Sequence, residues 1–543
     1  MKLDRRQLNF AALAWALAPW SRSAAQSGTA PLPGAPRWQS NPFSLGVASG
    51  MPRPDSVVLW TRLLGNAGSS FEAENALSPG ITLFVSYEIY SNSALTQLVQ
   101  KGSVQTSAER AFSVHVTLNG LASGREYFYR FRCGNAVSPV GRTRTAPAPD
   151  AAPGRLRIAL ASCQHFEQGY YSAHRDIAAQ DLDFVLFVGD YIYESSNPRF
   201  VVSAARRHAG RVPKTLDEYR ARHAQYKSDV NLQAAHAAHP WALTWDDHEV
   251  CNDYANDQDP ARTDPQEFLK RRAAAYRAYF EHMPLALGPD AAAGGQGMRI
   301  YDRMAWGQLA DVWTLDCRQY RSYHACQNPL QGGGRQATGC AELADLQRSM
   351  LGQEQENWLT QGLKSSSTHK TGDWKIIAQS TQISSSGLDA TGAAGSTDTS
   401  SGRSVNTDAW DGYPHARSRL LQTIADAKLA DVVTLGGDVH RNVAAQLRLR
   451  PNDSKSPIVA SELVCTSVTS HGGNPKTVER MLRSNPDIAY ARTDERGYCL
   501  LTVTPQQMAC DFRATQDAEQ ADAVLQTSQR YVVERGRAGV QKA

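Results

Sequence analysis

Between residues 41 and 146 the chain alternates apolar and polar positions with a period of two. Four segments carry this pattern and are rich in β-branched and aromatic residues: SVVLWTRL (56–63), ITLFVSYEIY (81–90), FSVHVTLNGL (112–121) and EYFYRFRCG (126–134). The alternation is typical of half-buried strands. It predicts an N-terminal antiparallel β-sandwich of the immunoglobulin or fibronectin kind over residues 41–146. The Pro- and Ala-rich stretch that follows indicates a linker over 147–155.

After the linker the pattern changes to short, nearly continuous apolar runs. These are LRIALA (156–161), DFVLFV (183–188), WALTW (241–245), DVWTL (311–315), WKIIAQ (374–379) and DVVTL (431–435). Helical stretches such as YYSAHRDIAAQ (170–180) separate them. Continuous apolar strands joined by helices are typical of sheets buried on both faces, so an α/β catalytic domain is predicted over 156–515. A helical tail is expected over 516–543.

The first 25 residues have the parts of a cleaved signal sequence: a basic start, a modest apolar stretch and small residues before the cleavage point. The pair Arg5-Arg6 before Leu8 resembles a twin-arginine signal, which predicts contact with the twin-arginine export machinery and a periplasmic or secreted location. An amphipathic N-terminal helix is the alternative. No apolar run reaches the roughly 18 residues of a membrane span.

Composition narrows the picture further. A formal net charge of +4 over 543 residues gives no reason to predict a nucleic-acid partner. Nine cysteines suit an oxidising compartment, and if one is kept for chemistry, eight remain for disulfides. Cys317, Cys326 and Cys340 lie close together in a loop-rich stretch, where a bridge among them is expected.

Four of the apolar runs end in polar residues that have ligand chemistry. LRIALA leads into Cys163, DFVLFV into Asp190 and Tyr193, WALTW into Asp247 and His248, and DVVTL into Asp438 and His440. In open α/β folds ligands bind at the carboxyl ends of strands. These side chains are therefore expected to converge, although a Gly-Asp after a single strand is more often just a turn.

The residue types in this set indicate cations. Crowded carboxylates repel one another unless a cation neutralises them. A tyrosinate ligand needs a strongly charged metal such as ferric iron, and the remaining acids suit a hard ion: calcium, magnesium or manganese. Two such metals polarise a phosphoryl group and activate a hydroxide. Gly-x-Ser-x-Gly, His-Glu-x-x-His and Gly-Lys are all missing, which excludes the hydrolases and P-loop proteins they mark.

At these residues the sequence resembles the alkaline phosphatase D (PhoD) family of the metallophosphoesterase superfamily. The resemblance rests on NPFSLGVASGMPRPDSVVLWTRL, ASCQ, GDYIYE, TWDDHEV, DAWDGYPHARSRLL and GGDVH, in that order. It implies a metallophosphoesterase domain of four α/β/β/α layers. It also implies export, and hydrolysis of phosphate mono- and diesters by a metal-activated hydroxide.

The resemblance also implies a role for each site residue. Cys163, Asp190, Tyr193 and His440 would hold one Fe³⁺, and Asp190, Asp247 and Asp438 would hold Ca²⁺, with one or two calcium ions in all. His248 would be the catalytic residue that assists the leaving oxygen. Cys251 stands where an acidic residue is common in the family, which affects any further calcium site.

Several alternatives stay open at this point. A phospholipase D-like phosphodiesterase acting at a phospholipid surface is one, a non-catalytic calcium-dependent binding protein is another, and a metal-dependent nuclease is a third. Asn252 and Asp253 are outer ligands or helix caps, Glu194 orients the tyrosine or is solvated, and Arg321 clamps phosphate or forms an ion pair. His165 is a further residue that could reach phosphate.

Overall fold

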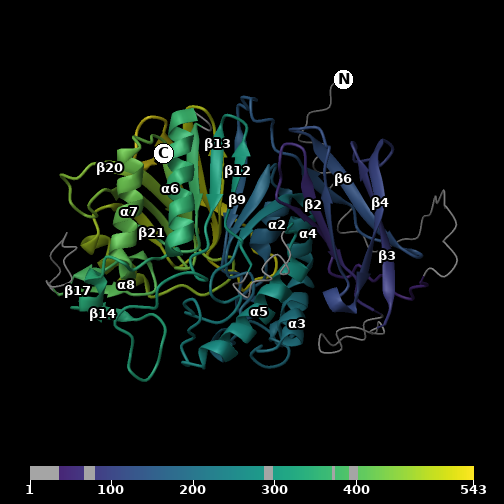
Figure 1. Ribbon diagram of the computed structural model, residues 1–543, viewed down its shortest axis with the longest axis horizontal. Coiled ribbons are helices and arrows are strands. Elements are labelled where there is room, and N and C mark those ends of the chain that lie inside the picture. Colours follow the sequence, from purple (N-terminus) through teal and green to yellow (C-terminus); the bar gives the residue numbers. More distant parts are fainter. Residues whose placement is uncertain (1–35, 66–79, 287–297, 370–372, 390–401) are drawn as a thin grey trace.

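A computed structural model describes residues 36–65, 80–286, 298–369, 373–389 and 402–543. The predicted signal sequence, 1–25, lies outside these ranges. Two large sheets and a smaller N-terminal sheet, which lies at one end of the molecule, organise the chain (Figure 1). Within the described ranges, every helix is too short or too polar to cross a bilayer.

The larger sheet has ten strands and combines parallel and antiparallel pairs. In spatial order they are β25 (Gln541–Lys542), β24 (Gln526–Glu534), β23 (Gln507–Thr515), β22 (Arg496–Val503), β9 (Leu156–Ala161), β10 (Phe184–Val188), β11 (Pro240–Thr244), β1 (Val47–Gly50), β2 (Val57–Arg62) and β5 (Ser113–Leu118). Strands β9, β10, β11 and β1 are parallel. All five residues of β10 are buried, as expected for a parallel strand covered on both faces.

The second sheet has seven strands. Their order is β12 (Asp302–Trp306), β13 (Ala310–Thr314), β15 (Trp374–Ala378), β18 (Val432–Gly436), β20 (Ile458–Val464), β19 (Asn442–Arg448) and β21 (Ile488–Arg492). The four strands β13, β15, β18 and β20 are parallel. A small three-stranded sheet of β14 (Gln336–Thr338), β17 (Arg403–Asn406) and β16 (Leu388–Asp389) lies beside this half of the molecule.

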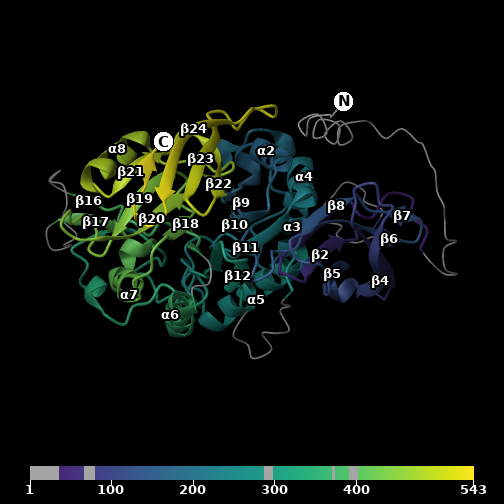
Figure 2. The same cartoon turned by 90° about the horizontal axis from the view of Figure 1, so that it is seen from above.

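The two large sheets pack face to face. Leu160 and Leu186 of the larger sheet share one apolar core with Ile376 and Leu435 of the smaller. The outer face of the larger sheet is covered by α2 (Ser172–Ala179), α3 (Leu216–Lys227), α4 (Val230–Ala238) and α5 (Pro265–His282). That of the smaller sheet is covered by α6 (Gly352–His369) and α7 (Pro414–Asp426), as Figure 2 shows. A last helix, α8 (Pro475–Ser484), packs against β21.

The N-terminal region is a sandwich that shares one of its two sheets with the rest of the chain. Strands β1, β2 and β5 extend the larger sheet, because β1 pairs in parallel with β11, Gly50 opposite Trp241. The other sheet consists of β4 (Leu98–Ser107), β3 (Thr82–Tyr90), β6 (Glu126–Cys133), β7 (Ala136–Val137) and β8 (Gly141–Arg144). Val57 and Leu59 pack on Val85 and Phe131 between the two sheets. The sandwich is therefore continuous with the α/β part.

The prediction of a helical tail over 516–543 is wrong. Residues 526–534 form β24, which pairs antiparallel with β23, and residues 541–542 form the edge strand β25. In the sequence QTSQRYVVE, Tyr531 and Val533 are buried and their neighbours are more exposed. This alternation with period two is the strand signal, and it outweighs the helix-favouring residues around it.

Eight cysteines were available for disulfides, but the structure has one bridge. Cys326 and Cys340 are joined, which confirms the bridge expected in that loop-rich stretch. The other seven cysteines are buried and unbridged. Several, such as Cys499 and Cys510, point into the core between the two sheets, where they pack as small apolar side chains.

Candidate metal centre

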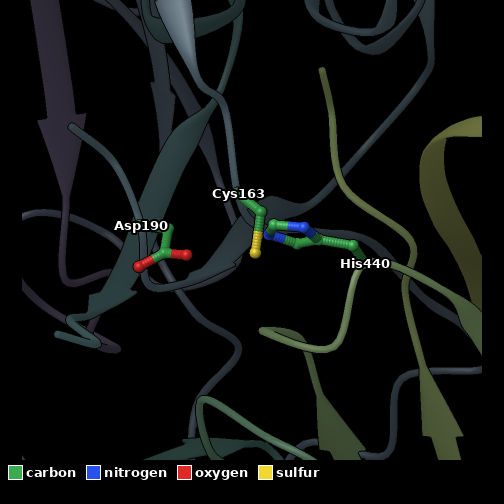
Figure 3. Close-up of side chains that lie close together, drawn as sticks. All are labelled: Cys163, Asp190 and His440. Carbon is green, nitrogen blue, oxygen red and sulfur yellow. The ribbon is translucent and has the colours of Figure 1, made fainter. Parts of the chain in front are cut away.

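The candidate site lies where the carboxyl ends of strands from both sheets meet. Cys163 follows β9, Asp190 follows β10, Asp247 follows β11, and Asp438 and His440 follow β18. Figure 3 shows Cys163, Asp190 and His440 side by side, although they come from three separate elements. Parallel strands place their carboxyl ends at one edge of a sheet, so residues far apart in sequence become neighbours there.

The first group of ligand atoms combines a thiol, a carboxylate, an imidazole and a phenol. The Sγ of Cys163, a carboxylate oxygen of Asp190 and a ring nitrogen of His440 all lie within 4.8 Å of one another. The Tyr193 hydroxyl donates to Asp190 Oδ2 at 2.7 Å and lies 3.2 Å from His440 Nε2. Ser470 Oγ donates to the same hydroxyl at 2.8 Å. These four side chains can therefore reach one cation.

The second group is adjacent and shares Asp190. Oxygens of Asp190 and Asp247 and a nitrogen of His248 lie within 4.8 Å of one another. His248 Nδ1 donates to Glu194 Oε2 at 2.6 Å, which directs its Nε2 away from Glu194. Burial lowers the pKa of His248, but the charges of Glu194, Asp190 and Asp247 outweigh it and raise that pKa well above its ordinary value. Glu194 and the neighbouring acids therefore favour the protonated form of His248.

Four of these residues have an uncommon backbone conformation. The φ angles of Cys163, Asp190, Asp438 and His440 are 58°, 58°, 62° and 48°. Non-glycine residues rarely adopt this left-handed region, and strain of this kind gathers at functional sites. The fold maintains an unfavourable backbone at the four positions that aim the candidate ligands inward.

Glycines at the strand ends allow neighbouring strand-end loops of the same sheet to approach each other. Gly189, just before Asp190, has a φ of 109°, and a Cβ there would lie 2.6 Å from Cβ of Asp246. A Cβ on Gly436 would overlap the carbonyl oxygen of Thr381 on the neighbouring strand connection. Larger residues at either position would push the ligand loops apart.

The carboxylates fit bound cations. Asp190 Oδ1 and Asp247 Oδ1 are buried and have no hydrogen-bond partner among the described residues. Burial, opposed by His248 but reinforced by Asp247, raises the pKa of Asp190 well above its usual range. Burial and the charges of Asp246 and Asp408 likewise raise the pKa of Asp438. Buried acids of this kind need either protons or a cation, and two orphaned oxygens aimed at one place favour a cation.

The imidazole of His440 is suited to bind a metal ion through Nε2. Its Nδ1 lies 2.7 Å from the carbonyl oxygen of His471 and must donate to it, so Nε2 carries the lone pair. Burial lowers the pKa of His440 to about 3, which keeps the ring neutral. Asp438 is not a member of the two groups above. Its Oδ2 accepts from Thr381 Oγ1 at 2.7 Å, and its side chain borders the adjacent cavity.

Sequence reasoning missed two residues that organise the acids. Buried Arg318 donates from Nε to Asp246 Oδ1 at 2.6 Å and from Nη1 to Asp408 Oδ1 at 2.6 Å. Glu249 accepts from the backbone amides of Tyr191 at 2.6 Å and Asp246 at 2.9 Å, and so ties two strand ends together. The signal for Arg318 was its position just after an apolar strand, in the same stretch as Arg321.

The other candidates have the following roles. Arg321 is buried against Asp408 and Tyr413, an ion pair rather than a phosphate clamp. Glu194 orients His248, not the tyrosine. Asp253 belongs to a third acidic group with Asp247 and Asp408, whose oxygens lie within 4.8 Å of one another.

Two further candidates lie beside the site. His165 packs its ring against Tyr193, with ring centroids 4.4 Å apart. Cys251 is an unbridged, buried thiol.

Comparisons with known proteins place the chain among phosphatases. The PhoD-like phosphatase model matches residues 158–512, and the model of the PhoD-like phosphatase N-terminal domain matches 26–147. Alkaline phosphatase D of Bacillus subtilis is 39% identical over 513 residues, which cover 94% of this chain and 83% of that protein. A solved structure of PhoD is 38% identical, with a TM-score of 0.85 over 94% of this chain and 93% of that one. The chain belongs to the PhoD-like phosphatase family.

Proposed function

We propose that this phosphatase is metal-dependent and hydrolyses phosphate mono- and diesters outside the cytoplasm. In the proposal Cys163, Asp190, Tyr193 and His440 hold Fe³⁺, while Asp190, Asp247 and Asp438 hold Ca²⁺. The observation that carries it is the first ligand group, because a thiol, a carboxylate and a neutral imidazole within 4.8 Å of one another form a ligand set for a transition metal. Asp190, Asp247 and Asp438 would offer the second ion oxygen ligands alone, the preference of calcium.

The cations, when bound, would polarise the phosphoryl group and make water a better nucleophile. The chain's own residues supply the proton transfer. His248 is held by Glu194 with Nε2 directed away from that carboxylate and with a raised pKa, so it can give a proton to the leaving oxygen. Asp190 belongs to both ligand groups, so it would hold both cations.

Elemental analysis and a visible spectrum of the purified protein test the metal assignment. We expect near-stoichiometric iron with calcium, and an absorption band from phenolate-to-iron charge transfer. Tyr193→Phe should abolish the band, whereas Tyr171→Phe, a buried tyrosine nearby whose hydroxyl donates to the Gln164 carbonyl oxygen, should keep it. Zinc alone, or a band that survives in Tyr193→Phe, would overturn the ligand assignment.

Substrate class and location need separate tests. Release of inorganic phosphate from monoesters and of alcohol from diesters measures the proposed range, and release of choline from phosphatidylcholine measures the phospholipase D-like alternative. The Cys326–Cys340 disulfide supports an oxidising compartment. Replacement of Arg5-Arg6 by Lys-Lys should retain the protein in the cytoplasm if the twin-arginine route is used.

A further inference from the structure

A cavity of about 440 Å³ lies beside the metal centre. Asp438 and His440 form part of its wall, and Val478 and Met481 of α8 form another part. Leu388 of β16 adds to the apolar side. The space is larger than a phosphoryl group needs, so it can take the group to which the phosphate is esterified. This reading depends on the function proposed above.

Arg441, next to His440 in the chain, also lines this cavity. Its Nη2 donates to Gln382 Oε1 at 2.8 Å, the one hydrogen bond that the described residues give its five N–H groups. Its Nε is buried and has no partner in the described part of the chain. No carboxylate of the described residues lies within ion-pair distance of Arg441.

Two buried arginines of this region, unlike the partly buried Arg441, are paired with carboxylates. Arg417 Nη1 donates to Asp411 at 2.6 Å, and Arg403 Nη1 donates to Asp389 at 2.6 Å. An arginine partly buried in the wall of an open cavity, with no carboxylate of the described residues at ion-pair distance, is placed to bind an anionic group of a ligand.

We propose that Arg441 is a specificity residue that binds a second anionic group on the leaving portion of the phosphate ester. The apolar wall of Leu388, Val478 and Met481 would contact the carbon body between the two anionic groups. The substrate class is therefore a phosphate ester whose leaving group combines an apolar body with a carboxylate or a second phosphate. Arginine suits this task because its planar fork binds such anions in a bidentate manner.

A matched pair of substrates tests the inference on the full-length, metal-loaded enzyme. Phenyl phosphate and 4-carboxyphenyl phosphate differ in one carboxylate, and the comparison between wild type and variant cancels their difference in reactivity. We expect Arg441→Gln to lower kcat/KM for the carboxylated ester by about 10- to 100-fold, the value of a charged hydrogen bond. The effect on phenyl phosphate should stay within about threefold on the same scale.

Arg480→Gln is the control, because it removes one positive charge from the exposed face of α8 without touching the cavity. It should leave both rates unchanged. An equal loss on both esters in Arg441→Gln would mean that Arg441 serves the transferred phosphoryl group, and no loss on either would mean that it binds no substrate. Both results overturn the inference. Wild type that hydrolyses neither ester would instead refute the proposed function.

Product inhibition gives a readout that does not depend on a variant that folds. In the wild-type enzyme, 4-hydroxybenzoate should inhibit hydrolysis of phenyl phosphate at concentrations about 10-fold below those of phenol, since only the former carries the second anion. Equal inhibition by the two phenols would contradict the assignment of Arg441.

Arg441→Lys keeps the positive charge but removes the planar guanidinium group. This variant should therefore lose part of the discrimination between the two esters.

Discussion

Replacement of Arg318 by Met tests whether the acids of the centre depend on this buried cation. The side chain of Arg318 is 1% exposed. It donates twice to Asp246, at 2.6 and 3.0 Å, and twice to Asp408, at 2.6 and 3.0 Å. It also lies 3.4 Å from Asp247. Removal of one partner from a buried ion pair typically costs about 3–5 kcal/mol, because the other charge is left desolvated and unpaired.

The structure places the expected cost near the lower end of that range. Asp408 would keep Arg321 at 3.2 Å and His324 at 2.7 Å, so most of its partners survive. Asp246 would keep no partner for its carboxylate among the described side chains. We therefore expect Arg318→Met to lower the free energy of unfolding by about 3 kcal/mol in calcium-free buffer. Added calcium should restore part of the loss, because a cation can take the place of the guanidinium.

Urea denaturation followed by tryptophan fluorescence measures this change. Arg530→Met is the control, since Arg530 pairs with Asp511 at the surface and its side chain is 55% exposed. Such a pair contributes less than about 1 kcal/mol. The double variant Arg318→Met with Asp246→Asn should recover stability relative to Arg318→Met alone. If Arg318→Met and Arg530→Met cost the same, the buried cation is not what stabilises the acids.

Three other perturbations have expected outcomes. Glu194→Gln removes a carboxylate that raises the pKa of His248, so the alkaline limb of the pH profile of kcat should move to lower pH. If that limb does not move, His248 is not the group that transfers the proton. Gly436→Ala should reduce folded yield, because its methyl group would overlap the Thr381 carbonyl, whereas the open position in Gly473→Ala should tolerate the change. Burial and Arg142 lower the pKa of His239 to about 3, so its contribution to stability is complete above its ordinary pKa near 6.5 and is lost as pH falls. Between pH 7.5 and 5 the wild type should lose about 2 kcal/mol more than His239→Gln in urea titrations.

Much of the candidate site could be predicted from sequence because its residues follow from local patterns. A buried strand that ends in Gly-Asp places Asp190 at a sheet edge whichever strands are its neighbours, and the same holds for Asp438. Arg318 could not be assigned in this way, since its partners Asp246 and Asp408 come from loops far away in the chain. Arg321 follows the same apolar strand in sequence, and only the packing in the structure distinguishes the roles of the two arginines.

The fold was predictable to a similar extent. Periodicity indicated strands over 41–146 and the change to an α/β pattern afterwards. It could not indicate that β1 pairs with β11, because a strand pairing between regions that distant leaves no local signal. The C-terminal error has the same origin. Strand β24 is a half-exposed strand near a sheet edge, whose alternation involves only Tyr531 and Val533.

The shared ten-stranded sheet has a consequence for the order of folding. Strands β1 and β2 leave the ribosome early, but β11, the parallel partner of β1, begins only at Pro240. Strand β9 can pair with β22, in which Val503 lies opposite Leu156, only after β22 has been synthesised. The β1–β2–β5 end of the sheet cannot join until β11 has been synthesised, and the opposite end cannot be completed until nearly the whole chain has been. Pairings at such long range slow folding and leave unpaired strand edges exposed. We therefore expect refolding to be slow and prone to aggregation, and an N-terminal fragment that ends near residue 146 to be unstable alone.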